Sequence, residues 1–319
     1  MKITIFDCDA DEAEAFRVLS PQYGIAPVIT ALPAAACADS PDFQNRCISV
    51  GHQSRITKAD LLILKSSGVQ LISTRSIGCD HIDTNAAGQL QIAVENAPYF
   101  PDGVADYTIM LILMAIRGTK SILLRASHND YRLNPCRGKE LRDMTVGIIG
   151  AGRIGRAVAA RLFGFGCHIL LCDPNGGADC VPLHELLQKS DLVTLHVPLS
   201  AKTYHLLGRE QLYSMKQGAF LVNTARGALV DTQALLNMLE RGRIGGAALD
   251  VLEGEEGIFY SDCSQNSMEH PFLPKLQAMP NVIVTPHTAY YTDRILYDTV
   301  RKTLQNCLDF ERRQEHEST

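Results

Sequence analysis

The chain has 319 residues, enough to bury two hydrophobic cores, which predicts two domains. Its formal net charge is −5 and it has no long basic run, so we expect neither nucleic acid nor an anionic membrane as a partner. The longest apolar run, 108–116, is too short to span a bilayer, and the acidic start does not resemble a secretory signal, so we expect a cytoplasmic protein.

The first third of the chain alternates between short apolar runs and helical patterns. Helices are predicted over Asp11–Leu19 and Lys58–Ser67. Strands are predicted at Lys2–Phe6, Cys47–Val50, Leu71–Ser73 and Ile92–Val94. This alternation predicts a mainly parallel sheet covered by helices. Because this part has no glycine fingerprint, we assign it to the substrate side.

Two turns in this part follow strands and lie where parallel sheets bind ligands. One contains Gly51 and His52, and the other contains Ile77 and Gly78. The N–H groups around Ile77 and Gly78 could hold a carboxylate, but an ordinary strand-to-helix connection would use the same residues. We interpret His52 as a plain loop histidine.

A turn-rich stretch, 96–103, predicts a crossover between domains. The helix predicted after it, Val104–Arg117, is apolar on nearly every side. Such a helix is normally buried, here between domains or between subunits.

A glycine-rich turn then follows an apolar strand pattern and opens a helical one, as Gly150-x-Gly152-x-x-Gly155. In dinucleotide-binding units the first glycine permits the tight turn and the second lets the backbone approach a pyrophosphate. The third allows the helix to pack closely on the strand. The helix N-terminus then favours the phosphates. Glycines alone also form plain turns, so the flanking elements carry the argument.

A second strand pattern, 167–172, leads to Asp173, about 20 residues beyond the turn. A carboxylate at this point is expected to accept hydrogen bonds from an adenosine ribose. It would repel a 2′-phosphate, and no Lys or Arg lies between Asp173 and Cys180. We therefore predict NAD as the cofactor, with NADH preferred over NADPH.

Further strands are predicted at Ser190–Pro198, Phe220–Gly227, Ala247–Val251 and Val282–His287, and a last helix at Asp293–Arg312. Arg226, Glu255 and His287 follow strand ends on the expected cofactor edge. Hydride transfer to a carbonyl requires a proton donor, which suits His287. A carboxylate substrate requires a cation, which suits Arg226, and Glu255 would orient and stabilise an imidazolium. Each residue alone also fits a surface or structural role.

These motifs resemble the D-specific 2-hydroxyacid dehydrogenases, and most of all the D-lactate dehydrogenases of vancomycin-resistance gene clusters, the VanH type. The resemblance covers essentially the whole chain. It rests on the glycine turn and on 223–227, 250–255 and 285–289, with 48–52, 75–79, 104–108 and 306–313 typical of the subgroup.

The resemblance implies two Rossmann-like or flavodoxin-like doubly wound parallel-sheet domains, with the active site in an interdomain cleft. It implies a catalytic domain of residues 1–100 plus 299–319, a dinucleotide-binding domain of 101–298, and a homodimer. It makes Arg226 the 2-keto acid ligand, His287 the acid/base and Glu255 its partner. Tyr99 and Tyr290 match positions lining the substrate pocket. The cofactor would contact Arg153, Ile154, Val197, Pro198, Thr203, Thr224, Ala225, Arg226 and Asp250.

We predict a D-lactate dehydrogenase that reduces pyruvate and other small 2-keto acids. Its D-lactate would supply D-Ala-D-lactate peptidoglycan precursors in vancomycin resistance. No metal is expected, because the ten cysteines lack metal-ligand spacing. One alternative is a dehydrogenase of the same family with a larger substrate. Another is a non-enzymatic NAD-sensing protein like the corepressors that share this architecture.

Overall fold

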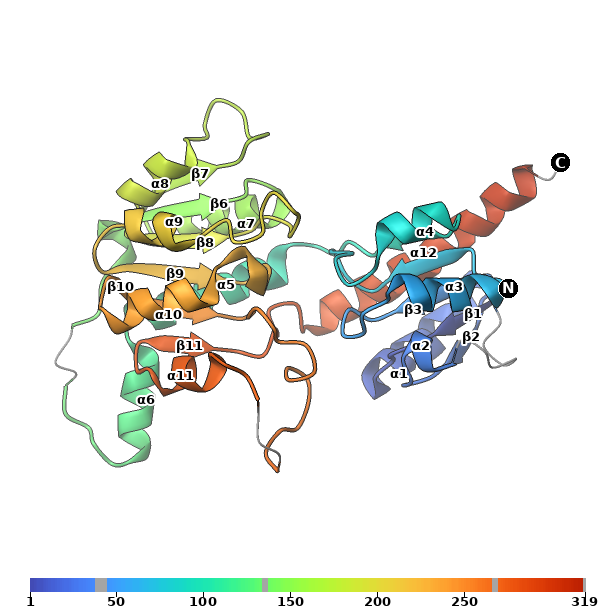
Figure 1. Ribbon diagram of the computed structural model, residues 1–319, viewed down its shortest axis with the longest axis horizontal. Coiled ribbons are helices and arrows are strands. Elements are labelled where there is room, and N and C mark those ends of the chain that lie inside the picture. Colours follow the sequence, from blue (N-terminus) through green and yellow to red (C-terminus); the bar gives the residue numbers. More distant parts are fainter. Residues whose placement is uncertain (38–44, 134–136, 266–268, 318–319) are drawn as a thin grey trace. The chain divides into compact units, whose positions relative to one another are not determined.

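The computed structural model describes residues 1–37, 45–133, 137–265 and 269–317 (Figure 1). The chain forms two compact units, one of Met1–Phe100 with Tyr291–Thr319 and one of Pro101–Tyr290. The sequence interpretation set these limits at 100 and 299. Because the last helix is continuous from Asp293, all of it belongs to the first unit.

The first unit contains a parallel five-stranded sheet in the order β2-β1-β3-β4-β5. The strands are β1 (Lys2–Ile5), β2 (Ala26–Ile29), β3 (Cys47–Val50), β4 (Leu71–Thr74) and β5 (Ala93–Asn96). The sequence interpretation missed β2. This strand lies at the edge of the sheet and is only half-buried; its apolar run is short and contains Pro27, a residue that argues against a strand.

The helices of the first unit are α1 (Ala10–Leu19), α2 (Ala34–Cys37), α3 (Lys58–Ser66), α4 (Thr84–Gln89) and α12 (Asp293–Glu317). The apolar stripe of α12 is buried: Val300, Leu304 and Cys307 pack in one cluster with Ile3 and Phe16. The C-terminal helix therefore contributes to the hydrophobic core of the unit that contains the N-terminus.

The second unit contains a parallel six-stranded sheet in the order β11-β10-β9-β8-β6-β7. The strands are β6 (Thr145–Ile149), β7 (His168–Cys172), β8 (Leu192–Leu195), β9 (Ala219–Asn223), β10 (Ile244–Leu249) and β11 (Val282–Val284). The sheet reverses its winding at β6, which lies between β7 and β8. Ligands of doubly wound sheets bind at such a point, beyond the carboxyl ends of the strands.

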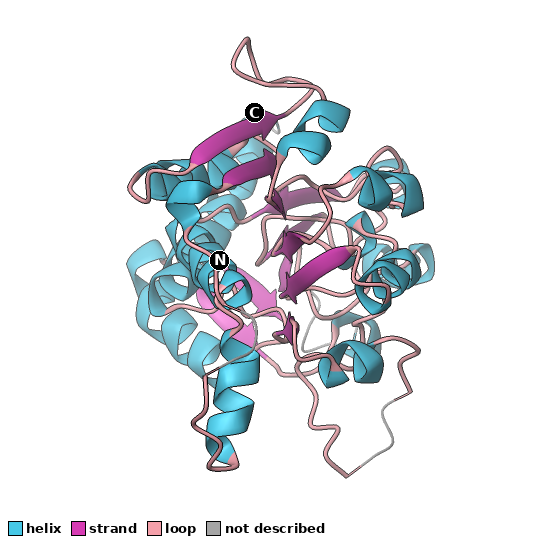
Figure 2. Ribbon diagram, turned by 90° about the vertical axis from the view of Figure 1, so that its left-hand side faces the viewer, coloured by secondary structure: helices cyan, strands magenta, loops and turns pink. Residues whose placement is uncertain are grey.

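Helices cover both faces of this sheet (Figure 2). They are α5 (Asp102–Ile116), α6 (Thr119–Ser127), α7 (Arg153–Phe163), α8 (Leu183–Lys189), α9 (Arg209–Ser214), α10 (Thr232–Glu240) and α11 (Leu273–Ala278). Adjacent residues of β9 pack in two different hydrophobic clusters. Leu221 packs with helices α8 to α11, and Val222 packs with α5 and α7. Strands buried on both faces read as continuous apolar runs, which explains why they were predictable.

The apolar helix α5 packs on the sheet of its own unit. Leu111 and Ile112 are fully buried there, in a cluster with Val146 and Ile148 of β6. The helix is therefore buried against the sheet of its own unit, and its burial between domains or subunits stays a prediction.

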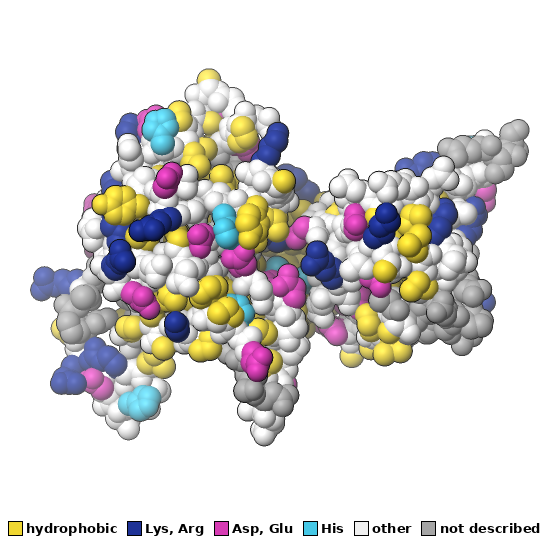
Figure 3. Space-filling view, viewed as in Figure 1, with side chains coloured by type: hydrophobic (Ala, Val, Ile, Leu, Met, Phe, Trp, Pro, Cys, Tyr) yellow, Lys and Arg dark blue, Asp and Glu magenta, His cyan; other side chains and the backbone are white. Residues whose placement is uncertain are grey.

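No single helix in the described ranges is long and apolar enough to cross a membrane. Helices α5 and α6 together have the length and apolar composition of a membrane span, but the pair is bent by 70°. On the face shown in Figure 3, Lys and Arg side chains are interspersed with Asp and Glu.

Candidate active site

The glycine-rich turn connects β6 to α7 in the predicted strand–turn–helix arrangement. Gly150 has φ +101°, and a Cβ there would lie 2.5 Å from the carbonyl oxygen of His196. A Cβ at Gly155 would collide with the carbonyl oxygen of Gly150. Gly152 is the N-cap of the eleven-residue α7, and a Cβ there would meet nothing within 4 Å. The open helix end and the close backbone approach fit a pyrophosphate group.

Asp173 follows β7 and is tied to this turn. Its Oδ2 accepts a hydrogen bond from the N–H of Ala151 at 2.9 Å, and its Oδ1 accepts one from the N–H of Asn175 at 2.8 Å. The carboxylate is therefore held beside the turn, at the edge where a ribose would lie, while acceptor capacity remains on both oxygens.

The predicted cofactor residues after β8 lie next to the same turn. A Cβ at Gly150 would also come within 2.9 Å of Val197. The Thr203 hydroxyl donates to the Pro198 carbonyl at 2.7 Å and accepts from the N–H of Ser200 at 2.8 Å, so it fixes this loop. Burial lowers the pKa of His196 to about 3, and its neutral ring lies 3.0 Å from the Thr194 hydroxyl.

The loop after β9 carries Arg226 and is fixed by Asn223. The Asn223 side chain donates to the Arg226 carbonyl at 2.8 Å and accepts from the N–H of Ala225 at 3.0 Å. The Arg226 guanidinium donates to the Ala225 carbonyl at 2.7 Å. Gly227 lies so close to the backbone of Leu252 that a Cβ would overlap it. The Arg226 loop therefore adjoins the loop after β10.

The predicted cofactor residue Thr224 hydrogen-bonds Thr108 of α5 at 2.9 Å.

Asp250, at the end of β10, is fully buried and holds the loop after β11. Its carboxylate accepts hydrogen bonds from the Thr285 hydroxyl at 2.6 Å and from the N–H groups of Thr288 and Ala289, both at 2.9 Å. Its backbone carbonyl accepts the N–H of His287 at 2.7 Å. The resemblance placed Asp250 near the nicotinamide. The observed bonds show that it anchors the segment that carries His287.

His287 and Glu255 form a close pair. The imidazole Nδ1 lies 2.6 Å from Glu255 Oε1, and the two side chains are 15% and 18% exposed. Glu255 Oε2 accepts the N–H of Leu252 at 2.6 Å, so the carboxylate is itself oriented. His287 has φ +55°, a left-handed conformation that costs about 1–2 kcal/mol for a residue with a Cβ. Such strain persists where several contacts impose it, which is typical of functional sites.

Two tyrosines adjoin His287. Tyr290, a predicted pocket residue, lies edge-on to the imidazole with ring centroids 6.0 Å apart. The Tyr260 hydroxyl donates to the His287 carbonyl at 2.9 Å, and the ring centroids of this pair are 6.2 Å apart. Tyr260 is 41% exposed as a residue, but burial of its hydroxyl end raises the pKa of that hydroxyl well above its usual range. The sequence interpretation missed Tyr260, because no motif marks it.

Ile77, Gly78 and Tyr99 belong to the first unit. The Ile77 carbonyl accepts from the Asn96 side chain at 2.7 Å, and the Gly78 carbonyl accepts from the Ser76 hydroxyl at 2.7 Å. In a trans peptide the N–H points opposite to the carbonyl. The N–H of Gly78 is thus turned away from Asn96. These bonds fix the loop, and the contribution of the three residues to a substrate site stays a prediction.

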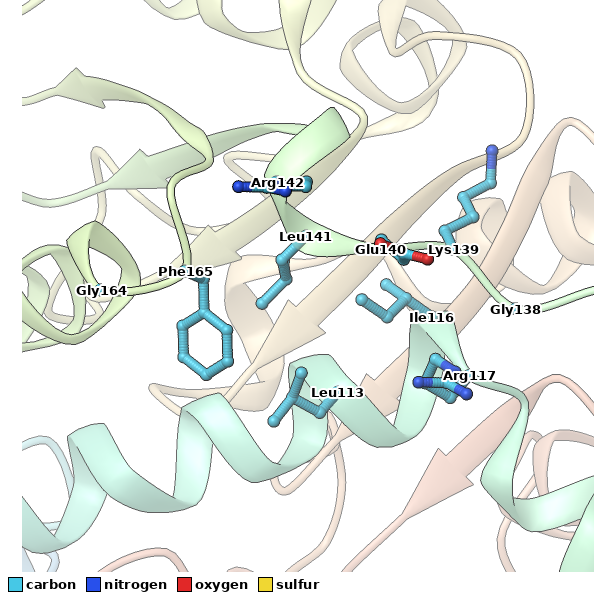
Figure 4. A pocket seen from close by; sticks show the side chains of 10 residues that line it. All are labelled: Leu113, Ile116, Arg117, Gly138, Lys139, Glu140, Leu141, Arg142, Gly164 and Phe165. Carbon is cyan, nitrogen blue, oxygen red and sulfur yellow. The ribbon is translucent and has the colours of Figure 1, made fainter.

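One hollow of about 580 Å³ lies elsewhere in the second unit (Figure 4). It is lined by the end of α5, the segment before β6 and the residues after α7, including Leu113, Ile116 and Phe165. None of the predicted site residues lines it. Across the described part of the chain, no cluster of His, Cys, Asp and Glu could hold a metal ion.

Similarity to known proteins extends over both units. Residues 109–289 match the family described as D-isomer specific 2-hydroxyacid dehydrogenase, NAD binding domain. A D-specific alpha-keto acid dehydrogenase of Enterococcus faecium is 58% identical over 99% of this chain and 98% of its own length. An aromatic 2-oxoacid reductase of Clostridium sporogenes is 35% identical over 98% of this chain and 96% of its own.

A solved structure shares the fold of the whole chain. The D-lactate dehydrogenase of Aquifex aeolicus, complexed with NAD and lactic acid, matches with a TM-score of 0.86 at 30% identity, over 97% of this chain and 95% of that one. This similarity confirms the two predicted doubly wound parallel-sheet domains. It also confirms the family that the motifs resemble. The chain belongs to the D-isomer specific 2-hydroxyacid dehydrogenases, a family of oxidoreductases, and carries their NAD-binding domain.

Proposed function

We propose that the protein is a D-lactate dehydrogenase that uses NADH to reduce pyruvate and other small 2-keto acids. The observation that carries the proposal is the Glu255–His287 pair on the loops beside Arg226, at the carboxyl edge of the NAD-binding sheet. The similarity to the D-lactate dehydrogenase of Aquifex aeolicus, complexed with NAD and lactic acid, supports the choice of substrate.

Arg226 would bind the substrate carboxylate. A guanidinium keeps its charge at all working pH values and presents several N–H donors in one plane, which suits a carboxylate. One N–H group of Arg226 donates to the Ala225 carbonyl, which helps to fix the plane of the guanidinium. The backbone N–H groups of Ile77 and Gly78 are proposed as further carboxylate ligands.

His287 would deliver the proton to the carbonyl oxygen. Because Nδ1 is paired with Glu255, the proton must move at Nε2. The carboxylate of Glu255 fixes the plane of the ring. In the reverse direction the same Nε2 would accept the proton of the hydroxy acid.

Residues of the NAD-binding domain would hold the cofactor, which supplies the hydride when bound. Gly150, Gly152 and Gly155 give the backbone shape for the pyrophosphate, and the N-terminus of α7 stabilises its charge. Asp173 would accept the ribose hydroxyls and repel a 2′-phosphate, which supports NADH over NADPH. Asp250 would act on this site by holding the His287 loop.

The testing experiment follows the loss of NADH absorbance with purified protein and a series of 2-keto acids. We expect rapid turnover of pyruvate, weaker turnover of branched and aromatic 2-keto acids, and D-lactate in a chiral assay of the product. Preference for a bulky 2-keto acid would favour the second candidate, a dehydrogenase with a larger substrate, which the similarity to an aromatic 2-oxoacid reductase supports. Tight NADH binding without turnover of any 2-keto acid would favour an NAD-sensing protein.

We propose a cytoplasmic role in vancomycin resistance, in which the D-lactate is consumed by a ligase that makes D-Ala-D-lactate precursors. The proposal rests on the resemblance of the motifs to that subgroup. Deletion of the gene is expected to lower the vancomycin concentration that its host tolerates, and added D-lactate is expected to restore tolerance. Unchanged tolerance after deletion would exclude this role.

We also propose a homodimer. Helix α6 exposes Ile122, Leu123 and Leu124, each about half, and Leu133 beyond it is 95% exposed. The Lys120 ammonium of α6 donates to three backbone carbonyls at the end of α11 and in β11, each at 2.7 Å. These bonds fix α6, and with it the apolar surface, against α11 and β11. Sedimentation is expected to give about twice the chain mass of 35.0 kDa, and Leu123→Glu is expected to give a monomer. A monomeric native protein would contradict the proposal.

A further inference from the structure

Both peptide groups that flank the Cα of His287 are held at their polar atoms. Before it, the His287 N–H donates to the Asp250 carbonyl at 2.7 Å and to the Thr285 carbonyl at 3.0 Å. After it, the His287 carbonyl accepts the Tyr260 hydroxyl at 2.9 Å, and the N–H of the same peptide, from Thr288, donates to the Asp250 carboxylate at 2.9 Å. The direction of the Cα–Cβ bond is set by these two planes.

Tyr260 is the anchor of the carbonyl end of this arrangement. The other bonds come from Asp250 and Thr285, at the ends of the strands that flank the loop, whereas Tyr260 reaches His287 from a separate segment. Its own φ is +67°, so its backbone is also held in a left-handed conformation. Without the hydroxyl, the peptide after His287 would lose the bond at its carbonyl and keep the bond at its N–H, which holds its plane less firmly.

A second tyrosine adjoins the same imidazole. The ring of Tyr290 lies edge-on to the ring of His287, with ring centroids 6.0 Å apart. Burial, followed by the neighbouring Tyr290, raises the pKa of the Tyr260 hydroxyl well above its usual range, so this hydroxyl stays neutral and donates to the His287 carbonyl.

We propose that Tyr260 is a positioning residue for the reaction: its hydroxyl fixes the left-handed backbone of His287, so that the imidazole stays on Glu255 with Nε2 directed to the substrate. The inference rests on the proposed role of His287. It assigns Tyr260 no contact with the reacting atoms. Replacement of Tyr260 is therefore expected to lower kcat and to leave the affinity for the cofactor unchanged.

The test compares Tyr260→Phe with wild type and with Tyr213→Phe as a matched control. Tyr213 is 65% exposed on α9, so the control removes the same hydroxyl from the same unit away from His287. Misplacement of an acid/base group by a fraction of an ångström lowers turnover by about 10–100-fold. We expect that loss in kcat for Tyr260→Phe and a kcat close to that of wild type for Tyr213→Phe.

Three further readouts separate positioning from general damage. The Kd for NADH and the KM for pyruvate should stay within about threefold of wild type. The isotope effect on kcat with NADH deuterated at the transferred position should rise, because the chemical step becomes slower than product release. The limb of the pH profile that reports His287 should move in Tyr260→Phe and stay in place in Tyr213→Phe.

A kcat of Tyr260→Phe within about twofold of wild type would overturn the proposal, as would a loss confined to KM or to the Kd for NADH. If wild type turns over no 2-keto acid, the proposed function fails and the positioning role is decided by NMR. The Cε1–H signal of His287, identified by its absence in His287→Gln, should broaden or split in Tyr260→Phe. An unchanged signal would refute the inference.

Discussion

Glu255 Oε1 lies 2.6 Å from Nδ1 of His287, and the partner oxygen of the carboxylate, Oε2, accepts the N–H of Leu252. The ring is thus oriented by a carboxylate that is itself oriented by the backbone three residues before it. A carboxylate held in this way fixes the orientation of the imidazole, and the proposed proton transfer takes place at the other ring nitrogen, Nε2.

Replacement of His287 by Gln removes the proposed proton donor and keeps the size and polarity of the side chain. General acid catalysis contributes about 10²–10⁴-fold, so we expect kcat to fall by that amount while the Kd for NADH, measured by fluorescence, stays unchanged. A matched control is His205→Gln, since His205 also pairs with a glutamate, Glu253, at 2.9 Å. Equal loss of activity in both variants would contradict the assignment.

Replacement of Asp250 by Asn should weaken the fold as well as the activity. The buried carboxylate accepts bonds from Thr285, Thr288 and Ala289, and an amide nitrogen would face one of these donors. A buried donor left without an acceptor costs about 1–3 kcal/mol, which we expect as a loss in the free energy of unfolding in urea. Asp262→Asn, at an exposed position, is the control and should leave that free energy unchanged.

Replacement of Asp173 by Ser should relax the choice of cofactor. The carboxylate that would repel a 2′-phosphate disappears, and the N–H groups of Ala151 and Asn175 lose their acceptor. The ratio of kcat/KM for NADH to that for NADPH is expected to fall about tenfold or more, equivalent to about 1.4 kcal/mol. Steady-state kinetics with both cofactors measures the ratio. A ratio equal to that of wild type would remove Asp173 from cofactor selection.

His196 should make the fold sensitive to mild acid. Burial holds the pKa of His196 at about 3, whereas in the unfolded chain the value is about 6.5. Between these values the unfolded chain binds a proton that the folded chain excludes, so stability falls as the pH decreases below about 6.5. We expect this residue to cost about 1–2 kcal/mol of the free energy of unfolding between about pH 6.5 and 4.5.

The check on His196 is His196→Gln, which keeps a polar partner for Thr194 but does not titrate. Its unfolding free energy should depend less on pH over that range than the free energy of wild type. His184→Gln, at an exposed position of α8, is the control and should follow wild type. Parallel pH profiles of the unfolding free energy for wild type and His196→Gln would contradict the prediction. They would show that His196 has the same protonation in the folded and the unfolded chain.

The sequence by itself determined the features that depend on neighbours along the chain. Strands buried on both faces are continuous apolar runs, and the turn at Gly150 needs glycine because its φ is positive and its backbone meets that of His196. Family motifs added Arg226, Glu255 and His287 as candidates. The local pattern failed at β2, a short edge strand in which Pro27 interrupts the apolar run and argues against a strand.

Only the tertiary structure decided which of these residues touch and what else holds them. The partners of Asp250 lie 35–39 residues away in the sequence, and the Tyr260 hydroxyl meets the His287 carbonyl across 27 residues. Hydrogen bonds between loops depend on the register of neighbouring strands and on the exit angle of each loop, and no periodicity records either. For that reason only the folded chain shows that Asp250 anchors the His287 loop and that Tyr260 contacts His287, whereas the cofactor contact of Asp250 stays a prediction.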